Sequence, residues 1–386
     1  MLSNLWVPVI RFIRRTGCSK RSMLDTIHHL KSALADLAHR LWMSVMLAYV
    51  TFVASFASAI FSAAIDQISQ QFRVSGEVAT LGISLYVLGF VFYQLYHGIM
   101  NNLIFRFAFG PIIWAPLSEL SGRRIPLIIG MFGYSLFSIA VATGKDYQTL
   151  MLCRVFAGFF SSSPLGVVPA CFADMYNNRD RGMAITVFAM AVFMGPFVSP
   201  CIGGFITMSY LGWRWTMYIS AIMGFLGVGL CLLFLKETYP PAILVAKAGK
   251  IRRQTKNWGI HAKQEEVEVD FHELLTNNFS RPIRLLITEP IVLLITIYMS
   301  FVYGLMYMLL SAYPIVFQGV HGMNLGVGGL PFFGLVLGQL LSGVYILVIQ
   351  RSYNKKLIAN NNVPIPEWRL PPVMVGAVAF AGGLFW

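Results

Sequence analysis

Long apolar stretches alternate with short polar ones along most of this chain. A transmembrane helix needs roughly 20 mainly apolar residues, and the stretches that reach this length are 41–65, 125–143, 149–174, 183–206, 215–235, 285–318 and 325–350. We interpret 78–117 as one more span, and the chain ends in a shorter apolar run, 373–386. The pattern predicts an all-α polytopic membrane protein with about nine transmembrane helices, the last one incomplete.

Composition supports this class and argues against others. Of the 386 residues, 57% are hydrophobic and only 12% are charged, about half the charged fraction of an average soluble domain. The net charge of +13 lies in loops between apolar runs, so we expect no nucleic-acid partner. Cysteine and histidine spacings match no metal site, catalytic triad or disulfide framework, so we expect no cofactor and no enzymatic activity.

The basic loops orient the predicted spans. Short cytoplasmic loops carry an excess of Lys and Arg, and a cytoplasmic amino terminus with a single crossing at 78–117 places every strongly basic loop on the cytoplasmic side. These loops hold Arg123 and Arg124, Arg179 and Arg181, the segment 236–284, and Arg351, Lys355 and Lys356. Two crossings at 78–117 would place four basic loops outside.

Residues 91–107 interrupt the second span with polar side chains. Gln94, His97, Asn101, Asn102 and Arg106 are costly beside lipid unless they are paired. Without 91–107 the flanking residues join into one apolar segment of about 20 residues. We therefore predict an insertion, such as a retained intron; the alternative is a genuine re-entrant or protruding helical segment.

The spans group into two sets around one polar segment. We predict a basic cytoplasmic amino-terminal segment, 1–40, a first six-helix half, 41–235, a cytoplasmic linker, 236–284, and an incomplete second half, 285–386. The linker mixes basic residues with six carboxylates, as expected of a solvated connection between two membrane domains.

Several motifs resemble those of the major facilitator superfamily. "APLSELSGRR" (115–124) resembles the signature after the second span, and "LMLCRVFAG" resembles the signature of the fourth span. "GPFVSPCIGG" (195–204) resembles the antiporter signature, and "KETYPPAILVAKAGKIRR" is similar to a segment of fungal multidrug:proton antiporters. The resemblance implies a fold of twelve helices in two halves around a central site.

The first and third motifs contain the candidate gating residues. We expect Glu119, Arg123 and Arg124 to pair with Asp174, Arg179 and Arg181 at the cytoplasmic helix ends, with Gly122 in the loop, so that Glu119→Gln or Arg123→Ala would reduce transport. In "GPFVSPCIGG", kinks and close helix packing are expected at Gly195, Pro196, Pro200, Gly203 and Gly204. Tight packing alone explains much of this motif, and sealing of one end of the transport path is the functional interpretation.

The coupling and substrate candidates are fewer. Arg154 is a cation inside an apolar helix, and it either takes part in coupling or binding or extends its side chain to the headgroups. Glu289, near the start of the seventh span, is the first candidate for a proton carrier, and Asp66, at the outer edge of the first span, is the alternative. Candidate substrate contacts, each with a lipid-facing or core role as the alternative, are Tyr86, Tyr303, Tyr307 and Gln339.

The resemblance implies a secondary transporter that exports small organic compounds or drugs by proton antiport with alternating access. Its partners would be a small organic substrate, protons and the lipid bilayer, and its location the plasma membrane or, alternatively, the vacuolar membrane. A solute or sugar facilitator or importer of the same fold, or a non-transporting membrane protein, remains the alternative. Because the second half stops in its third span, we expect the chain as printed not to transport alone.

Overall fold

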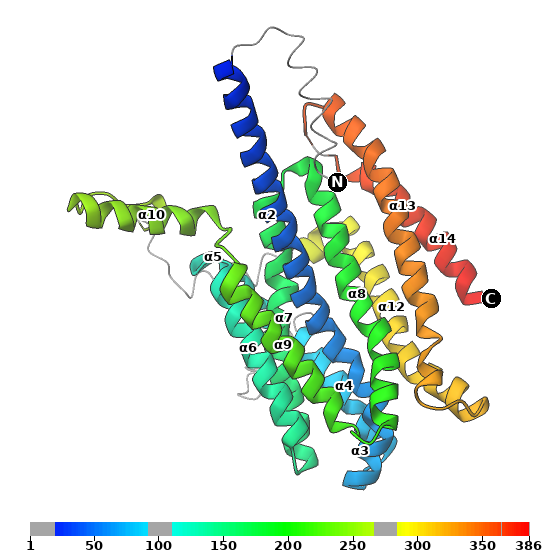
Figure 1. Cartoon of the computed structure of the whole chain (residues 1–386). Coiled ribbons are helices and arrows are strands. Elements are labelled where there is room, and N and C mark those ends of the chain that lie inside the picture. The colour runs from blue at the N-terminus through cyan, green and yellow to red at the C-terminus, as the bar shows by residue number, and fades with distance from the viewer. Residues whose placement is uncertain (1–19, 92–109, 266–283, 364, 386) are drawn as a thin grey trace. The chain divides into compact units, whose positions relative to one another are not determined.

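A computed structural model describes residues 20–91, 110–265, 284–363 and 365–385 (Figure 1). These residues divide into two compact units at Val45/Met46, and the contacts discussed below lie in the second unit. The described residues form helices joined by loops, without a strand. In the first part of the chain these are α2 (Lys20–Ala59), η1 (Ile60–Ala64), α3 (Ile65–Phe72), α4 (Gly76–Val91), α5 (Gly110–Leu120), α6 (Arg124–Thr143), α7 (Tyr147–Met175), α8 (Asn178–Met208) and α9 (Arg214–Phe234).

The remaining helices follow the sixth predicted span. They are α10 (Pro240–Thr255), η3 (Lys263–Glu265), α12 (Pro290–Tyr313), the π-helical η4 (Pro314–Val320), η5 (Val327–Gly329), α13 (Phe332–Ala359), η6 (Pro366–Arg369) and α14 (Pro371–Phe385). The predicted linker therefore contains a helix, α10, of 16 residues.

Helices that satisfy the length and hydropathy of a membrane span confirm the predicted fold class. Within the described residues there are seven of them: Ala38–Phe72, Arg124–Thr143, Tyr147–Met175, Asn178–Met208, Arg214–Phe234, Pro290–Val320 and Val327–Ala359. The first is longer than predicted because the helix continues through η1 and α3 to Phe72. The predicted second span corresponds to two shorter helices, α4 and α5, and the last to α14.

Close helix packing in the first part of the chain depends on small residues. Helix α7 packs against α4, α5 and α6, and α6 packs against α9. A Cβ atom added to Gly130 of α6 would collide with Ser163 of α7, and one added to Gly224 of α9 would collide with Ser135 of α6. Glycine and serine at such crossings allow helix backbones to approach closely where lipid leaves no hydrophobic driving force.

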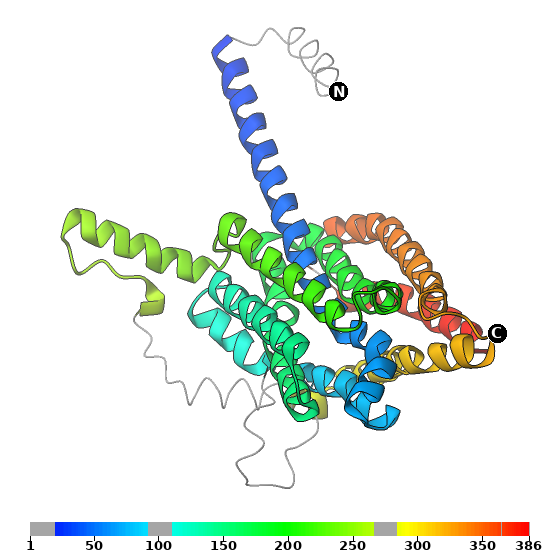
Figure 2. The ribbon, with the colours of Figure 1, turned by 60° about the horizontal axis from the view of Figure 1, so that its bottom comes forward.

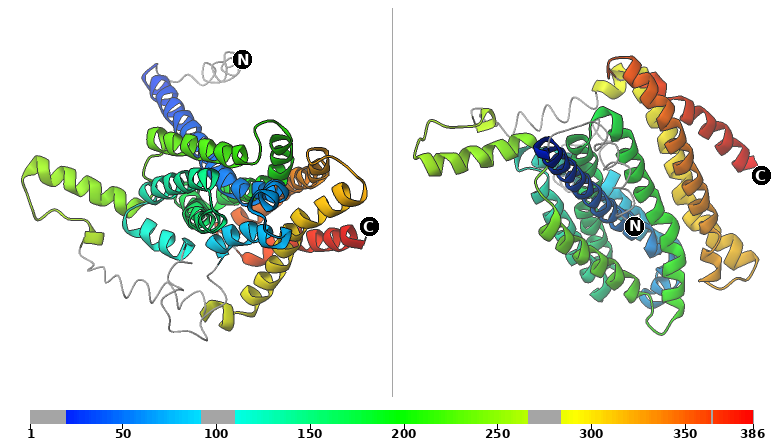
Figure 3. Two further views of the ribbon diagram at one scale, coloured as in Figure 1. Left: turned by 90° about the horizontal axis from the view of Figure 1, so that it is seen from below. Right: turned by 45° about the horizontal axis from the view of Figure 1, so that its top comes forward.

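Helices α12, α13 and α14 form a further set, in which α13 lies beside α8, as the right view of Figure 3 shows, and α12 also contacts α2. Helix α13 makes most of the contacts between this set and α8. We call the end of the helices that carries the loops 121–123, 176–177 and 235–239 the basic end, and the end with the loops 73–75, 144–146 and 209–213 the opposite end.

Helices α4 and α5 flank the predicted insertion. Apart from Val91, the last residue of α4, residues 91–107 lie outside the described residues. Tyr86 of α4 lies against Gly158 of α7. The indole N–H of Trp114 in α5 donates a hydrogen bond to the carbonyl of Phe159, also in α7 (3.1 Å). Both helices thus pack on α7, and the insertion stays a prediction.

Candidate functional site

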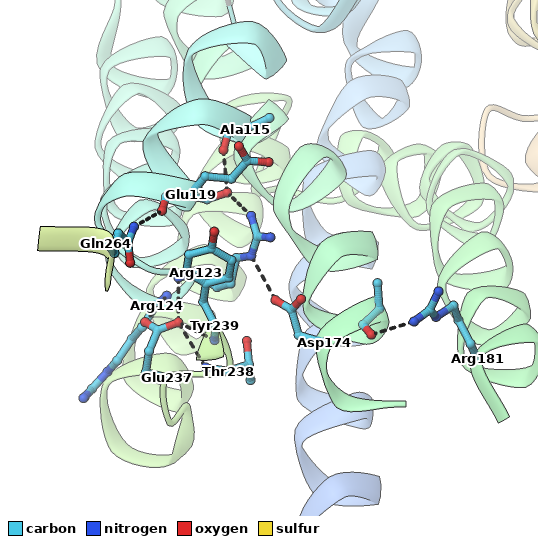
Figure 4. Close-up of polar contacts among 12 residues, drawn as sticks. Ala115, Glu119, Arg123, Arg124, Asp174, Arg181, Glu237, Thr238, Tyr239 and Gln264 are labelled. Atoms are coloured by element: carbon cyan, nitrogen blue, oxygen red, sulfur yellow. Dashed lines mark hydrogen bonds and ion pairs between the residues drawn. The ribbon is translucent and has the colours of Figure 1, made fainter. Parts of the chain in front are cut away.

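The Arg123 side chain is the centre of a polar cluster at the basic end (Figure 4). Its Nε atom donates to Oδ2 of Asp174 at the end of α7 (3.1 Å), and its Nη1 atom donates to Oγ of Ser118 in α5 (2.6 Å). The guanidinium also lies over the Tyr239 ring, 4.7 Å from its centroid. Because the side chain is only 8% exposed, these contacts are less screened than those of an ordinary surface ion pair.

Glu237 connects the same loop to the start of the predicted linker. Its Oε1 atom accepts hydrogen bonds from the backbone N–H groups of Arg123 (2.8 Å), Thr238 (3.0 Å) and Tyr239 (3.0 Å). Its Oε2 atom accepts one from the backbone N–H of Arg124 (3.2 Å). Helix α6 begins at Arg124, so a carboxylate distant in sequence caps its amino terminus, where free N–H groups and the helix dipole favour negative charge.

Gly122 gives the loop the conformation that this cap requires. Its φ angle is +85°, and an added Cβ atom would collide with the Glu237 carboxylate. Any other residue would therefore combine backbone strain with a clash. We name Ser118, Arg123, Asp174, Glu237 and Tyr239 the basic-end cluster.

The other predicted gating residues make different contacts. Glu119 is exposed and contributes its backbone carbonyl, which accepts from Nε2 of Gln264 (3.2 Å). Arg124 donates from Nη2 to the Leu232 carbonyl (2.8 Å), and Arg181 donates from Nη2 to the Ala173 carbonyl (3.0 Å). The exposed Arg179 contributes its carbonyl, which accepts from Gln350 (3.1 Å). Of the predicted charge pairs, the described residues thus bring together only Arg123 and Asp174.

The expected involvement of the Glu119 carboxylate therefore needs correction. Its place near the arginines is taken by Glu237, which the sequence did not single out. The sequence contained only a weak signal for this role of Glu237, which is one glutamate directly after the sixth apolar run and close to Tyr239. Because α9 returns the chain to the end where α6 begins, this glutamate lies close to the loop before α6.

Arg154 is enclosed by four helices near the opposite end. It is 2% exposed, and its Nε and Nη1 atoms donate to the carbonyls of Gly82 in α4 and Ala57 in α2, both at 3.2 Å. The guanidinium lies between the rings of Phe61 and Tyr86, 4.4 and 4.6 Å from their centroids. It does not extend to the headgroups, so that alternative is wrong.

One part of the Arg154 guanidinium makes no hydrogen bond in the described structure. The Nη2 atom is buried without a partner among the described residues, and no ion pair there involves Arg154. Contacts with two aromatic rings compensate part of the cost of burying the charge, but a buried cation ordinarily also needs an anion. The site therefore carries a net positive charge in a region of low dielectric.

The predicted tyrosines also lie among the helices. The Tyr86 hydroxyl donates to the Ala54 carbonyl (3.0 Å), and the Tyr307 hydroxyl is 2.9 Å from Oγ of Ser58. The Tyr303 ring lies 5.1 Å from the ring of Phe193. Tyr303 and Tyr307 thus join α12 to α8 and α2.

The residues of "GPFVSPCIGG" lie where α8 meets its neighbours most closely. Gly195 faces the α2 backbone at Phe56, and Gly203 faces Ile60 and Ala63 of η1. Gly204 faces the Leu325 carbonyl, and Gly329 of η5 faces the α8 backbone at Cys201. Pro196 and Pro200 are buried within α8. The motif thus packs between the first helix and the start of the predicted eighth span.

Gly195→Ala is expected to destabilise this packing. The new Cβ atom would lie 2.5 Å from the backbone nitrogen of Phe56, so α8 must move away from α2 at a cost of about 1–3 kcal/mol. Gly229→Ala in α9 is the matched control, because its Cβ atom meets nothing within 4 Å. Thermal unfolding of both variants in the same detergent measures the effect. Equal midpoints would contradict the close approach of α8 to α2.

A cavity of about 400 Å³ lies between α8, α13 and α14. Its lining is mostly apolar and includes Met190 and Phe193 of α8, together with Gln339 and Gln350 of α13. Gln339 donates from Nε2 to the Met190 carbonyl (2.7 Å), and its Oε1 atom is buried without a partner among the described residues. Volume and lining are typical of small-molecule sites.

Glu289, the predicted proton carrier, lies at the N-cap of α12. Its side chain is exposed and makes no hydrogen bond to the described residues. The role of Glu289 as a proton carrier therefore stays a prediction.

Comparisons with known proteins agree with this architecture. Residues 47–386 match the Major Facilitator Superfamily. The uncharacterized transporter C36.03c of Schizosaccharomyces pombe is 49% identical over 341 residues, 88% of this chain and 60% of that protein. The major facilitator superfamily multidrug transporter FLU1 of Candida albicans is 43% identical over 333 residues, 86% of this chain and 52% of FLU1.

A solved structure of the proton:xylose symporter XylE, bound to 6-bromo-6-deoxy-D-glucose, has a similar fold. The TM-score is 0.55 at 15% sequence identity, over 83% of this chain and 70% of XylE. The chain spans about half to three fifths of the length of the curated relatives that it matches. By its family match, its identity to fungal transporters and its apolar helices, this chain belongs to the major facilitator superfamily of transporters.

Proposed function

We propose that this chain is part of a proton-coupled antiporter that exports small organic compounds from the cytoplasm. The multidrug transporter named among its relatives and the apolar cavity that contains Gln339 support this class of substrate. Alternating access would come from rocking of α12, α13 and α14 against the first six spans. We place the basic end and the amino terminus in the cytoplasm and the protein in the plasma membrane, with the vacuolar membrane as the alternative.

The contacts of α8 suggest which end of the path is closed in this conformation. Near the opposite end, a Cβ atom added to Gly204 would lie 2.5 Å from the Leu325 carbonyl oxygen. A Cβ atom added to Gly329 would be similarly close to the backbone of Cys201. We infer that "GPFVSPCIGG" seals this external end against η5, and that substrate enters from the basic end. Opening would require α8 and η5 to separate.

The basic-end cluster would act within the first half of the transporter. Ser118, Arg123 and Asp174 belong to α5, the α5–α6 loop and α7, and Glu237 begins the linker. We infer that the cluster makes these helix ends move together and transmits their motion to the linker. This role differs from a latch between the two halves.

Arg154 supports the antiport mechanism. A fixed cation in a region of low dielectric raises the energy of any second cation nearby, and Arg154 is buried without an ion-pair partner in the described structure. A proton and a cationic substrate would therefore each bind weakly near Arg154, and in the same region of low dielectric their own charges would repel each other. Mutual exclusion of two ligands is what obligatory exchange requires.

The test is export of a fluorescent organic cation from yeast cells that lack their own drug exporters. The chain is expressed alone and together with the part of FLU1 that lies outside the matched region, since the relatives are longer. We expect export that stops when a protonophore dissipates the proton gradient. Export that is insensitive to the protonophore would indicate a facilitator. No export, either by the chain alone or together with the FLU1 part, would overturn the proposal.

A further inference from the structure

Helix α10 and the turn after it form a hairpin that is fixed at its start to the α5–α6 loop and at its end to the last turn of α5. At its start, Glu237 binds the backbone N–H groups of Arg123 and Arg124. At its end, Gln264 donates to the Glu119 carbonyl (3.2 Å). These contacts hold the hairpin, residues 240–265, at the level where α5 ends and α6 begins.

The hairpin is also closed internally. Arg252 donates from Nε to the Ile260 carbonyl (2.9 Å) and from Nη2 to Oε2 of Glu265 (2.8 Å). The backbone N–H of Ala262 donates to the same Glu265 oxygen (2.9 Å), and this bond, followed by the Arg252 charge, lowers the pKa of the Glu265 carboxyl. Arg252 therefore has a structural role that the neighbouring cations lack.

Helix α10 points away from the other helices and lies across their direction (Figures 1 and 2). Its 16 residues make a helix of about 24 Å, too short for the roughly 30 Å hydrocarbon core. A helix that leaves a membrane span six residues earlier and runs across the spans lies at the headgroup level of the bilayer.

One face of α10 combines exposed apolar and basic side chains. Ile243, Lys247, Lys250 and Gln254 follow each other at intervals of four, three and four residues, so they share one helix face. All four are exposed, Ile243 to 44%. Leu244 beside this face is 58% exposed, and Trp258 in the following turn is 79% exposed. We name Ile243, Lys247 and Lys250, with the exposed Leu244 and Arg253 at the two edges of their face, the α10 outer face.

The charge of the hairpin is strongly one-sided. From Pro240 to Glu265 it contains six Lys and Arg residues and a single carboxylate, Glu265, which Arg252 already neutralises. Anionic headgroups attract such clusters, and exposed Leu, Ile and Trp side chains enter the interface between headgroups and acyl chains. Aromatic and basic residues at one level of a membrane protein serve as interfacial anchors.

We propose that the α10 outer face binds the anionic lipid surface of the leaflet at the basic end. Lys247, Lys250 and Arg253 contact phosphate and carboxylate groups, while Ile243, Leu244 and Trp258 enter the apolar edge of the interface. Because the two ends of the hairpin are bound to the α5–α6 loop and to the last turn of α5, lipid binding fixes the position of the loop that carries Arg123 of the basic-end cluster. This interaction goes beyond transport and does not depend on the substrate.

The test is thiol accessibility of a Gln254→Cys variant of the full chain in lipid nanodiscs. Gln254 lies on the same side of α10 as the outer face and carries no charge, so the substitution leaves the anchors in place. Labelling by a water-soluble maleimide is compared between discs of phosphatidylcholine and discs that also contain phosphatidylserine, and the chain that retains Gln254 gives the background. We expect labelling to be slower by about fivefold or more with the anionic lipid, and high salt to restore the rate.

Two triple variants in the Gln254→Cys background distinguish lipid binding by the α10 outer face from a general effect of basic charge. The protection from labelling is expected to disappear in the variant that combines Lys247→Gln, Lys250→Gln and Arg253→Gln. The matched control removes three cations from the same end, at Arg351, Lys355 and Lys356, and is expected to keep it. The proposal would be overturned by any of three results: equal labelling in both discs, protection that high salt leaves unchanged, or protection that survives the α10 triple variant. Such a result would leave α10 as a surface for an acidic protein partner.

Discussion

Arg154→Met is expected to abolish proton-coupled export while leaving the thermal stability of the protein at or above that of the wild type. Of the two carbonyls that Arg154 contacts, that of Gly82 lies within α4, and that of Ala57 lies in the last turn of α2. Methionine fills much of the same volume between Phe61 and Tyr86 without a charge. Replacing buried charges by apolar side chains is often neutral or stabilising, by about 1–4 kcal/mol.

Two further variants make this result interpretable. Arg154→Ala leaves a cavity and is expected to lower stability by about 2–4 kcal/mol. Arg214→Met is the matched control, since Arg214 also lies over an aromatic ring, that of Trp213 at 5.1 Å, but at the start of α9; it is expected to export normally. Measurements are export by yeast cells and thermal unfolding in detergent. Normal export by Arg154→Met would exclude a role of this cation in coupling.

Glu237→Gln is expected to lower the free energy of unfolding by about 2–3 kcal/mol. Its carboxylate accepts four backbone N–H groups, among them those at the start of α6, and hydrogen bonds to a charged group contribute about 1.5–3 kcal/mol where burial limits hydration. The amide keeps one acceptor oxygen and brings an NH₂ group toward N–H donors. It also removes the negative charge that the α6 dipole favours.

The control for this prediction is Glu367→Gln, the same change at an exposed glutamate in η6. Thermal unfolding of both variants is followed in one detergent, and Glu237→Gln is also expected to increase proteolysis of the linker. A melting curve unchanged from wild type would show that the cap does not hold the loop and α10 together.

Local properties of the chain predicted the fold. Span length and hydropathy are read directly from consecutive residues, so the membrane helices and the all-α class were predicted from the sequence. Arg123 and Asp174 were predicted as partners because both lie at helix ends on the side that the basic loops define, and the structure places them 3.1 Å apart.

Other contacts set by tertiary packing were not predicted. Glu237 lies more than 100 residues from the loop it caps, and its partners are backbone groups, which leave no complementary charge in the sequence. Glu119 was chosen in its place because it is adjacent to the arginines in sequence, but it is exposed. The enclosure of Arg154 needs α2, α4, α7 and α9 together, and no local pattern contains that information.

Proton movement driven by substrate tests the central proposal most directly. Proteoliposomes that contain the transporter, in the arrangement that exports from yeast, are loaded with a pH-sensitive dye and given an organic cation on one side. The account predicts proton movement in the opposite direction to the substrate, at a rate that falls to background in Arg154→Met and stays normal in Arg214→Met. Substrate uptake without any proton movement, or proton movement that is equal in wild type and Arg154→Met, would contradict it.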